Sequence, residues 1–208
     1  MKKITSSAIL ALVLVTTSTE ATSWYVGVEQ SLSYKVKNTA EVGSYSKSNS
    51  ESPTITSIKV GAITGGDKKA GNRYEFLYNF GDKSANPVGG LQGEDVMSLN
   101  FNYHFTLPMI SPKEEILPYL RLGGSYIMSS DKYRDISTGE KANYSAVGAL
   151  VGVGTYYKVT DNINVSAGFD YGYRLWEDLT YYNYYRGSQT IESEDKFSKL
   201  YIGVDYLF

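Results

Sequence analysis

The sequence predicts an all-β protein, an eight-stranded antiparallel up-and-down transmembrane β-barrel. Eight segments alternate apolar residues with polar or small ones, which is the period of two that a β-strand imposes on its side chains. The composition agrees, with 20 Tyr, 20 Gly, only 5 Pro and a mean hydropathy of −0.28. No stretch after the first 23 residues approaches eighteen consecutive apolar residues. A membrane location would therefore require a barrel, whose tilted strands of about nine to eleven residues suffice to span.

The N-terminal segment has the pattern of a secretory signal peptide. Two lysines precede the apolar run Ala8–Val15, and small and polar residues follow it. The run is too short to cross the hydrocarbon as a helix. We therefore expect residues 1–21 to be cleaved, with position 23 as the alternative end, and residues 22–208 to form the barrel. The chain has no Cys, which excludes a lipoprotein anchor and a disulfide framework.

The first four predicted strands are separated by turn-forming and polar segments. Their apolar faces are the even positions from Trp24 to Val36, from Ile58 to Ala62 and from Tyr74 to Phe80, and the odd positions from Met97 to Phe105. The polar stretches 37–52 and 81–94 are predicted to be long loops, because Ser, Gly and Pro gather there. Thr64-Gly-Gly-Asp-Lys68 is predicted to be a short turn.

The last four predicted strands continue the alternation. Their apolar faces are the even positions from Leu120 to Met128, the odd positions from Val147 to Tyr157 and from Val165 to Leu175, and the even positions from Leu200 to Phe208. Residues 129–143 and 177–196 are predicted to be long loops, 160–162 a tight turn, and 106–117 a connection of intermediate length. Long and short connections therefore alternate, which favours a barrel with both termini in the periplasm and four extracellular loops.

The chain ends on a strand with an aromatic last residue. The apolar face of this strand consists of Leu200, Ile202, Val204, Tyr206 and Phe208. It resembles the C-terminal signature of bacterial outer-membrane β-barrels, although an edge strand of a soluble sandwich would show the same alternation. The resemblance extends over almost the whole chain after the signal segment, to the eight-stranded OmpA-like and OmpX-like barrels of the porin family. It implies a bacterial outer-membrane location among lipid and lipopolysaccharide, and an assembly signal in these five residues that the barrel-assembly machinery reads.

The charged residues of the predicted strands fall mainly on the face opposite the apolar one. They are Glu29, Lys59, Arg73, Glu75, Arg121, Lys158, Asp170, Arg174, Lys199 and Asp205. A soluble barrel would have to expose the many apolar residues of the other face, whereas lipid accepts them and a polar lumen accepts the charges. Opposite charges in so narrow a lumen should pair, because a lone buried ion is costly. We expect Glu29 and Lys59, on neighbouring strands, to form one such pair.

Aromatic residues near the strand ends are expected to form two interfacial girdles. The lower girdle would contain Trp24, Tyr103, Phe105, Tyr157, Tyr206 and Phe208, and the upper girdle Tyr34, Tyr78, Phe80, Tyr126 and Tyr173. The interior of an eight-stranded barrel is only wide enough for its own side chains, so the barrel should be plugged.

The sequence indicates no enzyme, cofactor or metal site. The single His, His104, is predicted to lie near the periplasmic rim, far from the outer leaflet where a lipid-modifying enzyme would act. We interpret it as a lumenal polar residue. Glu192, Glu194 and Asp195 lack the spacing of a calcium loop. The net charge of −2 gives no indication of a nucleic-acid partner.

The fourth long loop is rich in aromatics. Tyr181, Tyr182, Tyr184 and Tyr185 lie close together there, and tyrosine is favoured at recognition surfaces, although these rings would also extend the upper girdle. We therefore predict a monomeric barrel with a structural and surface-interaction role, similar to adhesion, toward a host or other surface ligand. The alternative is a narrow gated pore for small ions, since lumenal ion pairs can act as gates in the OmpA-type barrels that the chain resembles. A lipid-modifying enzyme ranks third.

Overall fold

The computed structural model describes residues 21–64, 71–81, 83–84, 94–111, 113, 115–134, 141–183 and 187–208. The predicted signal peptide, apart from Ala21, lies outside the described residues. The elements are β1 (Ala21–Val42), β2 (Tyr45–Glu51), β3 (Thr56–Thr64), β4 (Asn72–Phe80), β5 (Lys83–Ser84), β6 (Glu94–Thr106), the short 3-10 helix η2 (Pro108–Ile110), β7 (Ile116–Arg134), β8 (Lys141–Lys158), β9 (Ile163–Trp176), β10 (Leu179–Asn183) and β11 (Gly187–Leu207). No helix in the described part of the chain is long and apolar enough to cross a membrane.

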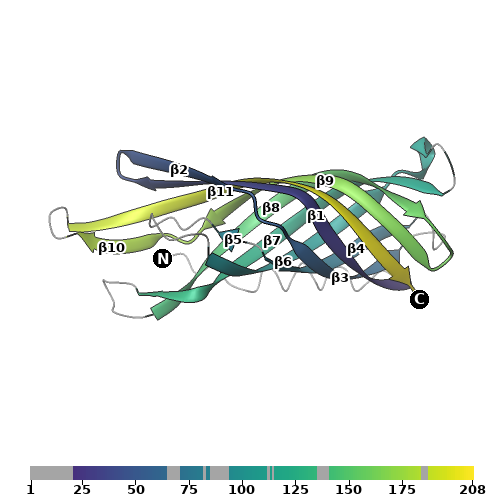
Figure 1. The fold of residues 1–208 in the computed structure, drawn as a ribbon, viewed down its shortest axis with the longest axis horizontal. Helices are drawn as coiled ribbons and strands as arrows, with labels where there is room; N and C mark the ends of the chain where they lie inside the picture. Colours follow the sequence, from purple (N-terminus) through teal and green to yellow (C-terminus); the bar gives the residue numbers. More distant parts are fainter. Residues whose placement is uncertain are drawn as a thin grey trace.

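Eight long strands form a closed barrel, which confirms the predicted fold class. Each strand pairs antiparallel with its neighbours in the order β1, β3, β4, β6, β7, β8, β9, β11, and β11 pairs with β1 (Figure 1). The closure extends to the last residue, because the backbone N–H of Phe208 donates to the carbonyl of Trp24 at 3.0 Å. A closed barrel leaves no unpaired strand edge, as a membrane-spanning sheet requires.

Several predicted loops are strands that continue the wall. Strand β1 runs on to Val42 and β2 pairs back on it, while β10 pairs with the start of β11. The loop predictions for residues 37–52, 129–143 and 177–196 were therefore largely wrong, since β7 also runs to Arg134 and β8 starts at Lys141. A polar segment can extend a hydrogen-bonded ladder once it has left the lipid. The β1–β2 and β10–β11 hairpins project from the same end of the barrel, opposite the C-terminus (Figure 1). We call the two ends the hairpin end and the turn end.

A bulge in β1 reverses which face of the strand points inward. The pairing of β1 with β11 shifts between Ser31 and Ser33, where one extra residue enters β1. Before the shift the even positions face outward, and Leu32 is still 63% exposed. After it the even positions face inward, so that Tyr34 is only 2% exposed. The assignment of Tyr34 to the upper girdle was wrong for this reason.

The outer wall is apolar through its middle. The other aromatic residues expected in the two girdles are exposed or half-buried on this wall, among them Trp24, Phe80, Phe105, Tyr157 and Phe208. Strand β11 shows the pattern clearly, since Leu200, Ile202 and Val204 point outward between buried residues. This surface is the reverse of a soluble barrel and matches the lipid-facing band of a membrane barrel.

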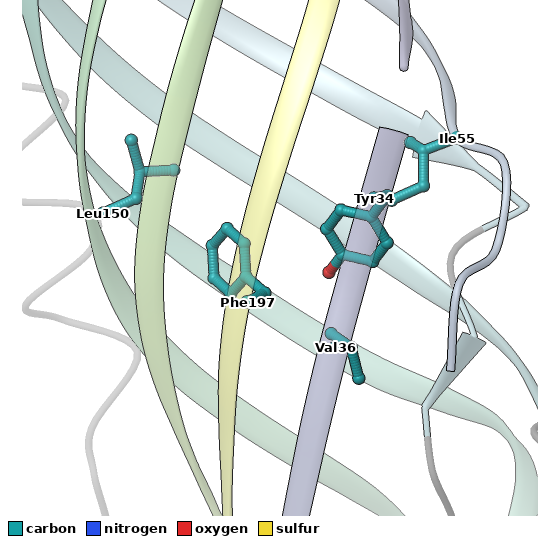
Figure 2. Close-up of a cluster of buried hydrophobic side chains, with 5 residues drawn as sticks. All are labelled: Tyr34, Val36, Ile55, Leu150 and Phe197. Carbon is teal, nitrogen blue, oxygen red and sulfur yellow. The ribbon is translucent and has the colours of Figure 1, made fainter. Parts of the chain in front are cut away.

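The interior is filled in layers. Toward the turn end lie two apolar clusters, one of Tyr25, Ile63 and Leu207 and one of Leu117, Tyr119 and Tyr156. Charged side chains fill the middle. Toward the hairpin end lie two further apolar clusters, one of Tyr34, Val36, Ile55, Leu150 and Phe197 (Figure 2) and one of Val96, Ile127, Ala146 and Trp176. In the first of these Phe197 lies between Leu150 and Tyr34, with its ring centroid 5.8 Å from that of Tyr34.

Candidate functional site

Arg121 of β7 is the centre of a buried charged layer inside the barrel. Its Nη1 donates to Asp170 at 2.7 Å. Its Nη2 donates to Glu29 at 3.0 Å and to Glu75 at 2.8 Å, and its Nε donates to the His104 ring at 2.8 Å. All five side chains are almost completely buried. One guanidinium therefore binds groups from β1, β4, β6 and β9, which its planar fork of five donors makes possible.

Three further cations neutralise the remaining negative charge of the layer. Lys199 donates to Glu29 at 2.6 Å, and Lys59 lies 2.7 Å from Asp205 and 3.6 Å from Glu75. Arg73 Nη1 lies 3.6 Å from Asp205. The layer thus contains four carboxylates, Glu29, Glu75, Asp170 and Asp205, and four cations, Lys59, Arg73, Arg121 and Lys199. This balance matters because a single unpaired ion in such an interior would cost several kcal/mol.

The expected pair of Glu29 with Lys59 was wrong. Glu29 lies opposite Ser57 in the β1–β3 pairing, while Lys59 lies opposite Gly27. A side chain at Gly27 would collide with both Asp205 and Lys59, at 2.3 Å and 2.9 Å from its Cβ. The missing side chain therefore lets Lys59 reach across β1 to Asp205 of β11. Glu29 instead binds Lys199 and Arg121.

Two other predicted members of the lumenal network lie outside this layer. Lys158 is at the turn end, where it pairs with Asp161 of the β8–β9 turn at 2.5 Å and remains 25% exposed. Its prediction as part of the network was wrong, because β8 leaves the lumen at that residue. Arg174 lies closer to the hairpin end, directly opposite Asp195 in the β9–β11 pairing and 4.3 Å from the centre of the Phe197 ring.

His104 is buried inside the barrel as a polar partner of Arg121. A guanidinium N–H can only donate, so Nε2 of His104 must accept the hydrogen bond from Arg121. The ring proton of a neutral His104 is then on Nδ1, where it is donated to the hydroxyl of Tyr156. The ring also stacks on Tyr119 with centroids 4.8 Å apart. Both ring nitrogens therefore form hydrogen bonds inside the barrel.

Sequence reasoning missed the tyrosines that line the charged layer. Tyr119 and Tyr201 are joined through their hydroxyls at 2.6 Å, and Arg73 lies 3.6 Å from the centre of the Tyr156 ring. Tyr25 donates to Glu75 at 3.3 Å. Alternation carried the signal for Tyr25, because it stands at an inward position of the first strand. Asp195, which accepts a hydrogen bond from Asn38 at 2.6 Å, was missed because it was assigned to a loop.

The remaining predicted site residues belong to the tyrosine-rich loop and to the C-terminal strand. Tyr181 and Tyr182 are in β10, opposite Gln189 and Ser188 of β11, whereas Tyr184 and Tyr185 lie outside the described residues. The five residues of the expected assembly signal are all exposed on the outer face of β11. They are Leu200, Ile202, Val204, Tyr206 and Phe208.

Comparisons with known proteins found similar solved structures but no relative by sequence. A scan of protein-family models found no match, and neither did a search of curated protein sequences. Among solved structures, Neisserial surface protein A matches at 17% identity over 88% of this chain and 96% of its own, with a TM-score of 0.48. The N-terminal β-barrel domain of Pseudomonas aeruginosa OprF matches at 15% identity, 88% and 97% coverage and a TM-score of 0.40. The attachment invasion locus protein Ail of Yersinia pestis matches at 13% identity, 88% and 98% coverage and a TM-score of 0.41.

The class of the protein follows from its own wall and interior. The barrel closes with eight antiparallel strands, presents apolar side chains outward and holds its charges inside. Only a lipid environment suits that arrangement of faces. The chain is therefore an eight-stranded transmembrane β-barrel protein of the outer-membrane type.

Proposed function

We propose that this protein anchors a surface-interaction site in the outer membrane, where it has a structural and adhesion-like role. The observation that carries the proposal is the pair of hairpins at the hairpin end. Strand β2 is exposed on both faces along nearly its whole length, so the β1–β2 hairpin stands clear of the wall. Hairpins held by a rigid barrel can vary without disturbing its hydrogen bonds, which suits them to recognition. Their partner would be a host or other surface ligand.

The proposal includes the orientation and the processing of the chain. Residues 1–21 would be removed on export, and the turn end would face the periplasm. The hairpin end would then be extracellular, in keeping with the long outer connections of bacterial barrels. The exposed apolar residues that end β11 would serve the assembly machinery as its signal.

A narrow gated pore is the second candidate. The charged layer favours it, because ion pairs in a lumen could exchange partners and admit small ions. The apolar clusters on both sides of that layer oppose it, since buried side chains such as Phe197 and Trp176 occupy the interior there. We therefore rank conduction below the surface role.

An enzymatic role has less support. His104 is fully buried, and its ring nitrogens are engaged by Arg121 and Tyr156. A general base must reach the proton that it abstracts, and this ring has no access to a lipid substrate. We propose that the protein is not an enzyme.

The test replaces Tyr181, Tyr182, Tyr184 and Tyr185 together by Ser. The variant should assemble and keep its heat-modifiable migration in gels, because the barrel wall is unchanged, while attachment of expressing cells to host surfaces falls. Met109→Ser, which removes an exposed apolar side chain of η2 at the turn end, is the control and should retain attachment. Normal attachment by an assembled four-tyrosine variant would refute the role of this loop.

A further inference from the structure

The outer wall changes character abruptly where β1 and β11 leave the apolar band. Leu32 and Leu200 are the last large apolar side chains on the outer faces of these strands. Directly beyond them, Lys35, Lys37 and Lys196 point outward and are exposed. The bulge in β1 is responsible for this arrangement, because it brings the odd positions that carry both lysines of β1 to the outer face.

Two of these lysines face each other across the seam. Lys37 and Lys196 are direct partners in the β1–β11 pairing, and Lys35 is two residues closer to the apolar band, opposite Ser198. Side chains directly opposite each other start about 5 Å apart, and diagonal neighbours about 7 to 8 Å apart. Like charges in this position destabilise a sheet unless an anion is shared between them. Glu194 pairs with Lys196 at 3.1 Å, and Lys196 also lies 5.9 Å from the centre of the Tyr173 ring. With Glu194 included, the three lysines still leave two positive charges for a second anion.

The height of the lysines matches the headgroup region of a bilayer. Lys196 lies ten residues along β11 from Tyr206 of the lower girdle. At about 3.3 Å per residue and a tilt of about 40°, ten residues rise about 25 Å, which is the height of the apolar band of such barrels. The ammonium groups therefore lie where the phosphates of the outer leaflet begin.

Negative charge replaces positive charge one step farther out. Glu41 and Glu192 are the next outward pair beyond Thr39 and Glu194 in the same pairing. These carboxylates would repel a phosphate bound higher on the hairpin. An anion is thus favoured at one level of the wall only, the level of the lysines.

We propose that Lys35, Lys37 and Lys196 form a binding site for the phosphate groups of an outer-leaflet glycolipid. The site is continuous with the lipid-facing wall and complementary in charge to such headgroups. The acyl chains of the lipid would lie on Leu32 and Leu200 directly below. The site is separate from the recognition loop, and it requires only that the hairpin end faces the outer leaflet.

The test measures binding of purified lipid A to the refolded barrel in neutral detergent by native mass spectrometry. The parent should bind lipid A that carries both phosphates and discriminate against dephosphorylated lipid A. One lysine near an anionic headgroup raises the affinity roughly fivefold. The double variant Lys37→Gln with Lys196→Gln should therefore weaken lipid A binding about thirtyfold. Lys47→Gln with Lys113→Gln removes the same charge from exposed positions elsewhere and should bind as the parent does.

Heat-modifiable migration of each variant establishes that its barrel is closed. Lys37→Arg with Lys196→Arg keeps both charges and should retain parental affinity. If the double glutamine variant does not close, Lys37→Gln and Lys196→Gln alone, each expected to lose about fivefold, decide the question. Equal losses in the two double glutamine variants, or a parent that binds dephosphorylated lipid A equally well, would overturn the proposal.

Discussion

Replacement of Arg121 by Met should destabilise the barrel more than any other removal of a single charge. The substitution keeps much of the volume but removes the donors to Glu29, Glu75, Asp170 and His104. Three of those acceptors are carboxylates, and a hydrogen bond to a charged group contributes about 1.5 to 3 kcal/mol. The layer would also be left with one more carboxylate than it has cations.

The magnitude follows from the burial of the partners. Removal of one member of a buried ion pair costs on the order of 3 to 5 kcal/mol, because the remaining charge stays in the interior unpaired. Arg121 serves three carboxylates at once, so we expect a loss at the upper end, about 5 kcal/mol in the free energy of unfolding. Arg121→Lys should lose less but remain well below the parent, since an ammonium has three donors for four acceptors.

The assay is equilibrium unfolding by denaturant in detergent micelles, followed by tryptophan fluorescence and by migration of unboiled samples. Lys158→Met is the matched control, because it removes the same charge from a pair at the exposed rim and should cost less than about 1 kcal/mol. Arg121→Met combined with Asp170→Asn should cost less than the sum of the two single changes, since the neutral amide no longer leaves a stranded charge. The reasoning fails if Arg121→Met and Lys158→Met lower stability by the same amount.

Three further predictions concern the wall and its ends. Gly61→Ala should lower the free energy of unfolding by about 1 to 3 kcal/mol, because the new Cβ would lie 2.3 Å from the buried Tyr25 ring. Gly124→Ala is the control and should be nearly neutral, because its Cβ meets nothing closer than 3.8 Å. Hydrogen bonds from Tyr173 and Lys196 lower the pKa of Glu194 in the folded protein. The carboxylate therefore stabilises the fold at pH values above its unfolded pKa of about 4.5, and this stabilisation is lost as the pH falls through the lower folded pKa. Glu194→Gln should thus lower the unfolding midpoint slightly at pH 7 and by less at pH 3, and an equal shift at both values would contradict the assignment. A cysteine at Ser48 should react with an impermeant maleimide on intact cells and one at Asp161 should not, while the reverse would invert the orientation.

Much of the candidate site could be read from the sequence because a strand has a fixed period. Glu75, Arg121 and Asp205 were placed inside by alternation alone, and they lie in the charged layer. Their contacts could not be read in the same way. Lys59 reaches Asp205 across β1, and that contact depends on strand tilt, on the reach of the side chain and on the absence of a side chain at Gly27.

The sequence by itself determined the number of wall strands, which face of each strand is apolar, and that the opposite face carries charges of both signs. Each of these depends on local alternation, which a chain carries along its length. Only the tertiary structure decided that β1 contains a bulge, that Tyr34 turns inward after it, and that Lys37 meets Lys196 across the seam. A bulge cannot be recognised from one strand alone, because its extra residue is defined only by the pairing of β1 with β11. The partner strand, distant in the sequence, determines which of two equally regular alternations faces the lipid.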